Sequence, residues 1–182
     1  MRKNIVLIVF FFACASQFAQ AEKKRRYPDE IDYRYHFDVP MPKNTKEGVL
    51  NDGDDKTEVN WHQRKVAVIC EFDRTYEISS MEIVTKKHTK WYILKELHIS
   101  LDDGSGEFAA PFIVKTYGKL PEKGAPLIDE SCRSYVYQPE IKGLACRVKI
   151  DFVGSAAIGV SEIRLRGREP EPPPNNQRYF FK

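Results

Sequence analysis

The sequence lacks the patterns of the fibrous, disordered and strongly basic classes of protein. It has no Gly-X-Y period and no heptad run, which excludes collagen-like proteins and coiled coils. Its formal net charge is only +3 and 12% of its residues are aromatic, unlike a disordered chain or a strongly basic nucleic-acid-binding protein. The length of 182 residues therefore fits one compact domain with short tails.

The motifs of common enzymes and metal sites are also missing. The sequence contains no GxSxG, HExxH, Walker loop or CxxC, and its histidines do not have metal-ligand spacing. Residues 104–109 formally fit the GxGxxA dinucleotide pattern, but Pro111 and a predicted strand follow where the phosphate-binding helix would begin. We therefore expect a hairpin turn at these glycines. The missing motifs leave an enzymatic activity unsupported without excluding one.

Residues 1–21 have the features of a secretory signal peptide. Arg2 and Lys3 precede an apolar run over residues 5–13, and Ala19-Gln-Ala21 provides a small-residue cleavage site. Spanning a membrane takes about 20 apolar residues, so the run predicts export and no membrane-spanning anchor. The mature protein is expected to be secreted or periplasmic.

Three cysteines stay in the chain after cleavage: Cys70, Cys132 and Cys146. An odd number permits at most one disulfide and leaves a thiol over, and the sequence does not decide the pairing. Cys70 and Cys146 each lie in a series that is apolar at every second residue. Both are therefore predicted to pack as small core residues.

The mature chain is predicted to have a body between two tails. Residues 22–48 are charged and aromatic and form an N-terminal extension that leads into the body, which covers residues 49–167. Residues 168–182 are rich in proline and form a C-terminal tail.

Apolar residues in the body recur with a period of two, which is typical of β-strands. Strands are expected over residues 65–72, 78–84, 97–101, 112–117, 134–138, 144–152 and 160–166. Turn signals rich in Gly, Pro and Asp separate them, and no stretch longer than ten residues carries a helical stripe. This spacing favours an all-β antiparallel sandwich or barrel.

Acidic residues are crowded into a turn at residues 49–57, just before the first predicted strand. A Ca²⁺ ion needs six to eight oxygen ligands, which carboxylates and turn carbonyls can supply together. The EF-hand pattern does not fit, because Lys56 and Thr57 occupy the positions of its ligand and its glycine. The residues alone leave open a calcium loop and a simple acidic turn that faces solvent.

Several segments of the body, taken in chain order, resemble the galactose-binding-like domains. This family includes the discoidin and coagulation-factor type C modules and the family 32 carbohydrate-binding modules. The segments are Leu50–Trp61 with its Asp-Gly turn, Val68–Asp73, Ile78–Val84, the hairpin Leu97–Phe108, Ala145–Ile150 and Val160–Gly167. The resemblance spans nearly all of residues 49–167 and implies a jelly-roll β-sandwich of about eight antiparallel strands.

The resemblance also implies a structural calcium ion that joins the acidic turn to the last strand. The side-chain ligands would be Asp52, Thr57 and Glu162. Backbone carbonyls would come from Val49, Asp54 and Ser161.

Ligand binding in the resembled modules uses loops at one end of the sandwich. A sugar needs an aromatic face and planar or ionic hydrogen-bond partners. The segment 86–92 provides both, and a second predicted turn adds two residues; the candidates are Trp91 and Tyr92 as platforms, His88 and Lys90 as hydroxyl partners, and Arg133 and Tyr135. Taken singly, Trp91 or Tyr92 could equally pack under the loop as core. The chain shows no obvious His/Arg/Asn trio, so the resemblance does not extend to galactose or fucose specificity.

The sequence thus predicts a non-catalytic module that binds a carbohydrate or cell-surface glycan. The alternative is a protein-interaction or adhesion module on the same fold, which would present residues 86–92 and the aromatic tail 179–181 to a protein partner. No nucleic-acid partner is expected.

Overall fold

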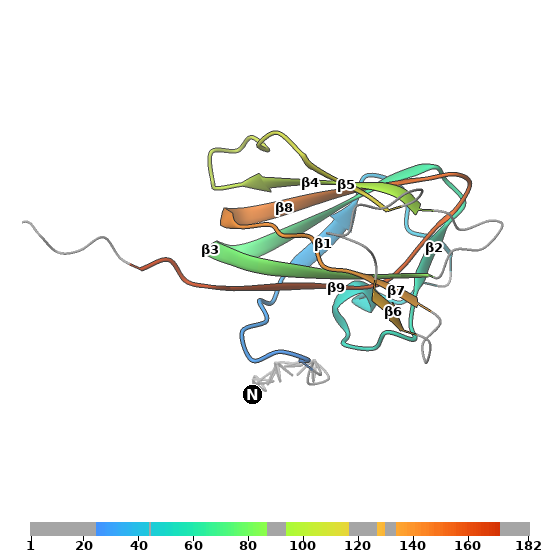
Figure 1. Cartoon of the computed structure of the whole chain (residues 1–182), viewed down its shortest axis with the longest axis horizontal. Helices are drawn as coiled ribbons and strands as arrows, with labels where there is room; N and C mark the ends of the chain where they lie inside the picture. The colour runs from blue at the N-terminus through green and yellow to red at the C-terminus, as the bar shows by residue number, and fades with distance from the viewer. Residues whose placement is uncertain (1–24, 44, 87–93, 117–126, 130–133, 172–182) are drawn as a thin grey trace, which may run out of the picture.

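The computed structural model describes residues 25–43, 45–86, 94–116, 127–129 and 134–171, and within them the protein is a β-sandwich (Figure 1). The described strands are β1 Arg34–Phe37, β2 Val59–Trp61, β3 Lys65–Lys86, β4 Leu94–Asp102, β5 Phe112–Lys115, β6 Leu127–Asp129, β7 Ser134–Tyr137, β8 Gly143–Gly154 and β9 Ile158–Arg168. A single 3-10 turn, η1 (Val49–Asn51), lies between β1 and β2. All strand pairs are antiparallel, which confirms the predicted class.

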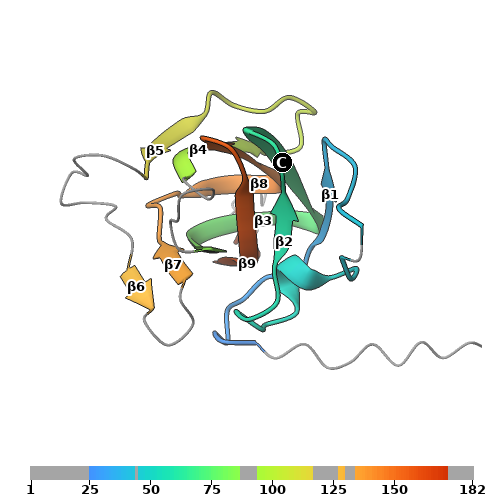
Figure 2. The ribbon, with the colours of Figure 1, turned by 90° about the vertical axis from the view of Figure 1, so that its right-hand side faces the viewer.

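The long strand β3 belongs to both layers of the sandwich. Its first half pairs with β1 and β8, and its second half pairs with β9 and β7. Because β4 joins β8 and β5 joins β4, one layer runs β1-β3-β8-β4-β5 and the other β6-β7-β3-β9-β2. Seen from one end, the strands surround a common interior (Figure 2).

The sequence predicted two strands, 65–72 and 78–84, where the structure has the single strand β3. The register between β3 and β8 shifts between Glu71 and Tyr76, so the chain bends there without leaving the sheet. Such a bulge inserts extra residues on one strand and increases the local twist. The bulge is what lets one strand pass from one layer to the other.

The core is filled by alternate residues from the inner faces of both layers. These include Leu97, Ile99, Val148, Ile150 and Phe152 from one layer and Ile83, Ile163 and Leu165 from the other, all at most 1% exposed. Fully burying one such side chain contributes about 1.5–3 kcal/mol relative to leaving it exposed. Alternation of this kind is the pattern from which the strands were predicted.

The N-terminal segment is built into the sandwich from Ile31 onward. Ile31 and Tyr33 are buried, and β1 pairs with the first half of β3. The Tyr33 hydroxyl lies 3.0 Å from the Leu50 carbonyl oxygen and 2.5 Å from that of Ile163. Part of the predicted extension 22–48 therefore connects η1 to β9.

The predicted turn at residues 102–106 is confirmed as the start of the connection between β4 and β5. The Asp102 carboxylate accepts hydrogen bonds from the Gly104 and Gly106 amides, at 2.9 and 3.1 Å. Both glycines have positive φ angles, 111° and 88°, which side chains disfavour. No helix follows them, so the GxGxxA match has no phosphate-binding geometry.

Cys70 is buried as predicted, but Cys146 is only partly buried, and neither forms a disulfide. The prediction for Cys146 was wrong because the alternation of core-facing residues on β8 shifts by one position opposite the β3 bulge. Ala145 and Val148 face the core, while Leu144 is 48% exposed. Cys132 lies outside the described residues. No described helix has the length and apolar character needed to cross a membrane.

Candidate functional site

The predicted sugar-binding residues fall largely outside the part of the chain that the structure describes. His88, Lys90, Trp91, Tyr92 and Arg133 are all in this group. Tyr135 is described.

Tyr135 lies on β7 opposite Thr85, one residue before β3 ends at Lys86. Its half-buried ring packs edge-to-face on Tyr137, with centroids 6.4 Å apart. The structure therefore places Tyr135 beside the strand end from which the predicted loop departs.

The side chains of the predicted calcium turn lie close to one another. The Thr57 hydroxyl is 2.9 Å from both the Asp52 Oδ2 atom and the Asp54 carbonyl oxygen. The Gly53 amide donates to Glu162 Oε2 at 3.0 Å, which joins the turn to β9. Glu162 is fully buried. These contacts place Glu162 against the turn that carries Asp52, Asp54 and Thr57. The calcium site itself stays a prediction.

The other two predicted ligands flank this cluster. Val49 opens η1, which packs against β9, and Ser161 precedes Glu162 on that strand; both are buried. Among the described residues no group of three or more His, Cys, Asp or Glu side chains is placed to hold a metal ion. An ion at this turn would therefore depend on carboxylates and neutral oxygens, the ligand set of Ca²⁺ rather than of Zn²⁺.

A buried arginine lies beside the same turn. The side chain of Arg164 is 2% exposed; its guanidinium pairs with Asp55 of the turn and donates to Glu82 Oε1 at 2.7 Å. Arg26 approaches the same two carboxylates, at 3.3 Å from Glu82 and 3.5 Å from Asp55. The protein thus uses its own guanidinium groups to join the turn, β3, β9 and the N-terminal segment.

Glu82 lies at the centre of this network. Its Oε2 atom accepts hydrogen bonds from the Tyr27 hydroxyl and the Gln138 amide, each at 3.0 Å. Burial alone would raise the pKa of Glu82, but these hydrogen bonds and the charges of Arg164 and Arg26 outweigh it and hold the pKa below its usual value. Glu82 is therefore ionised at neutral pH.

The sequence analysis missed this network. Arg164 and Glu82 alternate with apolar residues, as do charged residues on the solvent-facing side of an ordinary strand. Their direct pairing across β3 and β9 is visible only once the register is known. The opposite charges at these two positions were the one available signal.

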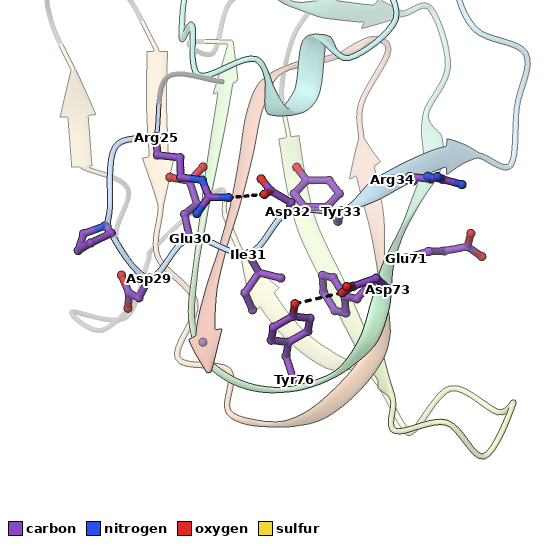
Figure 3. Close-up of a pocket in the computed structure, with 13 residues that line it drawn as sticks. Arg25, Asp29, Glu30, Ile31, Asp32, Tyr33, Arg34, Glu71, Asp73 and Tyr76 are labelled. Atoms are coloured by element: carbon purple, nitrogen blue, oxygen red, sulfur yellow. Dashed lines mark hydrogen bonds and ion pairs between the residues drawn. The ribbon is translucent and has the colours of Figure 1, made fainter. Parts of the chain in front are cut away.

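A groove of about 770 Å³ lies between the N-terminal segment and the β3 bulge (Figure 3). One wall carries Arg25 and Asp32, which form an ion pair, and the other carries Asp73 and Tyr76. The Tyr76 hydroxyl donates to Asp73 Oδ1 at 3.0 Å, and Ile31 lies between the walls (Figure 3).

Neighbouring aromatic rings hold the Tyr76 ring of the groove in place. The Tyr76 ring meets Phe72 edge-to-face, with centroids 5.7 Å apart, and Phe72 in turn meets Tyr33 at 6.5 Å. Slight desolvation would raise the pKa of Asp73, but hydrogen bonds from Arg74 and Tyr76 hold it below its usual value. The groove therefore combines a fixed aromatic ring with an ionised carboxylate. The sequence analysis did not find it, because its walls come from segments 40 residues apart.

Solved structures with the same architecture are carbohydrate-binding modules and related domains. A family 32 module of a family 31 glycoside hydrolase from Clostridium perfringens aligns with a TM-score of 0.58 at 13% identity, covering 77% of this chain and 96% of that one. A second C. perfringens family 32 module, solved in complex with GalNAc-β-1,3-galactose, gives a TM-score of 0.55 at 12% identity, with 74% and 95% covered.

The C-terminal domain of a chitobiase from Bacteroides fragilis gives a TM-score of 0.57 at 12% identity, with 79% of this chain and all of that domain covered. No protein-family model and no curated protein matches the sequence. Identities this low establish the fold alone. The chain has the galactose-binding-like fold of the family 32 carbohydrate-binding modules.

Proposed function

We propose that the protein is an exported, non-catalytic module that binds a glycan through loops at one end of the sandwich. The main support is the fold, which it shares with family 32 modules over nearly their whole length. Trp91 and Tyr92 would supply the aromatic platform, and His88, Lys90 and Arg133 the hydroxyl partners. Tyr135 pairs with Thr85, one residue before β3 ends and the proposed loop begins.

Binding of this kind involves no covalent step. Stacking on an aromatic ring and a few hydrogen bonds supply the affinity, so a single site should bind with a dissociation constant of roughly micromolar to millimolar. Attachment to a larger assembly or a multivalent surface would raise the effective affinity.

The proposal is tested on a glycan array with the purified protein. We expect binding to at least one glycan class, and loss of most of that signal in the Trp91→Ala variant. Phe112→Ala is the matched control, because Phe112 is a half-exposed aromatic residue on β5 and lies outside the proposed loop site. A folded protein that binds no glycan on a broad array would reject the proposal in favour of a protein-interaction module.

A structural calcium ion at the acidic turn is the second part of the proposal. Asp52, Thr57 and Glu162 would bind it through side chains, and Val49, Asp54 and Ser161 through carbonyls. The support is that the Thr57 hydroxyl lies within hydrogen-bond distance of the Asp52 carboxylate and the Asp54 carbonyl oxygen, and that Glu162 accepts a hydrogen bond from the Gly53 amide of the same turn. When bound, the ion would neutralise the carboxylates where the turn meets β9.

Calcium should therefore raise the unfolding temperature. At a free Ca²⁺ concentration ten times its dissociation constant, we expect about 1.4 kcal/mol of added stability relative to EDTA. Asp52→Asn and Glu162→Gln should remove the difference between the two conditions. Asp103→Asn, in the turn after β4, should leave it intact. Identical melting of the unmodified protein with calcium and with EDTA would contradict the ion.

A further inference from the structure

We propose that the groove between the N-terminal segment and the β3 bulge is a second saccharide-binding site, selective for uncharged sugars. This inference rests on the proposed glycan-binding function, but it concerns a different part of the molecule. Tyr76, in the groove, is ten residues before Lys86, where β3 ends and the proposed loop begins. At roughly 3.3 Å per residue the two places are about 33 Å apart along the strand.

Tyr76 provides the aromatic surface that sugar rings require. Its hydroxyl is held by Asp73 at 3.0 Å and its ring by the edge of Phe72, so its rotamer is fixed before a ligand arrives. The side chain is only half-buried and lines the groove. A sugar can stack its C–H face on such a ring, and little side-chain freedom is lost on binding because the ring is already held.

Hydrogen-bonding groups stand on both walls. The Asp32 and Asp73 side chains are 62% and 59% exposed, and arginines, Arg25 and Arg74, hold them in place. Each carboxylate has more lone pairs than its arginine uses, and these can accept hydrogen bonds from sugar hydroxyls. The Arg25 guanidinium adds donors for ring or hydroxyl oxygens. Planar groups of both kinds flank the aromatic ring.

The charge of the lining determines the class of sugar. Five carboxylates line the groove, from Asp29, Glu30, Asp32, Glu71 and Asp73. The lining also contains the guanidinium groups of Arg25 and Arg34, and Arg166 and Arg74 pair with Asp29 and Asp73 from beside it. The five carboxylates exceed the four guanidinium groups by one negative charge, which disfavours sulfated, phosphorylated or sialylated glycans because like charges repel at close range. An apolar ligand would desolvate the charged groups of the walls without offering them hydrogen bonds in return. Uncharged saccharides satisfy both conditions.

The test is a titration of the ¹⁵N-labelled protein followed by two-dimensional NMR. The uncharged probes are N-acetyllactosamine, cellotetraose and chitotetraose; the anionic probes are 3′-sialyllactose and a heparin tetrasaccharide. We expect at least one uncharged probe to shift the amides of residues 25–34 and 71–76, and neither anionic probe to do so. Binding of the anionic probes in the groove at equal affinity would overturn the selectivity.

Variants separate the two sites. Tyr76→Ala should weaken binding in the groove at least tenfold, whereas Tyr76→Phe, which keeps the ring, should change it less than threefold. Asp32→Ala is a second variant at an exposed position, so it tests the groove even if Tyr76→Ala fails to fold. Phe112→Ala is the control and should leave groove binding unchanged.

The outcomes separate failure of the groove proposal from failure of the proposed glycan-binding function. If saccharides shift only residues 85–86 and 134–136, and Trp91→Ala abolishes the effect, the groove proposal is overturned and the glycan-binding function stands. If no saccharide shifts any amide of the folded protein, both fail. Shifts in the groove that Tyr76→Ala removes support the second site.

Discussion

Replacing Arg164 with methionine is expected to destabilise the protein by about 3–5 kcal/mol, the usual cost of removing one partner from a buried ion pair. The guanidinium lies between Asp55 of the acidic turn and Glu82 of β3, and its side chain is 2% exposed. Methionine fills a similar volume but leaves both carboxylates without their main counter-charge. The free energy of unfolding from urea denaturation measures the effect.

Two further variants give this prediction its controls. Arg168→Met breaks the ion pair with Glu77, but the Arg168 side chain is 66% exposed, so the cost should be within about 1 kcal/mol. Adding Glu82→Gln to Arg164→Met removes the buried charge that has lost its main counter-charge and should recover part of the loss. A cost for Arg164→Met no larger than that for Arg168→Met would show that the network contributes little to stability.

The pH dependence of the stability of Arg164→Met tests whether Arg164 acts as the counter-charge of Glu82. The pKa of Glu82 in the folded protein lies below its usual value, so its stabilising contribution is fully present above the unfolded pKa. That contribution is lost as the pH falls through the folded pKa. Acidification should therefore reduce the stability of the unmodified protein more steeply than that of Arg164→Met. Parallel pH curves for the two proteins would contradict the assigned role of Arg164.

The layers of the fold could be predicted from the sequence because burial imposes a period of two on each strand. Series such as Val148, Ile150 and Phe152 mark one face directly, and they are all fully buried. The acidic turn and Glu162 were brought together by a resemblance in motif order, and the structure places them in contact. The period of two and the order of motifs along the chain are therefore enough to predict the strands and the proximity of the acidic turn to Glu162.

The bulge in β3 could not be predicted, and two errors follow from it. Pairing register depends on the partner strand, so the sequence of β8 alone does not show where the alternation of its core-facing residues shifts. Cys146 was assigned to the core on that alternation, whereas Ala145 takes the inward position and Leu144 is exposed. The union of two predicted strands into β3 has the same origin.

The groove and the Arg164 network were hidden for a different reason. The groove and the Arg26 contact of the network both depend on the N-terminal segment lying over the sandwich, which places Arg26 beside Glu82 and Asp32 across from Tyr76. In sequence, a charged segment beside a predicted signal peptide is typical of a solvated tail. Its backbone bonds in the structure, such as Ile31 N–H to the Leu165 carbonyl at 2.8 Å, show that it is attached to the sandwich.

Gly167 is the residue on which this attachment depends most directly. A β-carbon at this position would lie 2.4 Å from the Glu77 carbonyl oxygen and 3.0 Å from the Ile31 side chain. Its amide also donates to the Asp29 carbonyl at 3.1 Å. The strand backbones and the N-terminal segment therefore meet with no space for a side chain. Gly167→Ala must separate them, and overpacking of this severity costs about 3 kcal/mol.

Gly167→Ala should lower the stability of the whole protein and also loosen the attachment of the N-terminal segment. We expect a lower urea midpoint, faster hydrogen exchange of the Ile31 amide and weaker binding of any saccharide that occupies the groove. Gly106→Ala is the contrast: no atom lies within 4 Å of its added β-carbon, so its cost comes from the φ angle of 88° alone. That variant should leave Ile31 exchange unchanged. Because the N-terminal segment forms one wall of the groove, unchanged Ile31 protection in Gly167→Ala would mean that Gly167 does not hold that wall in place.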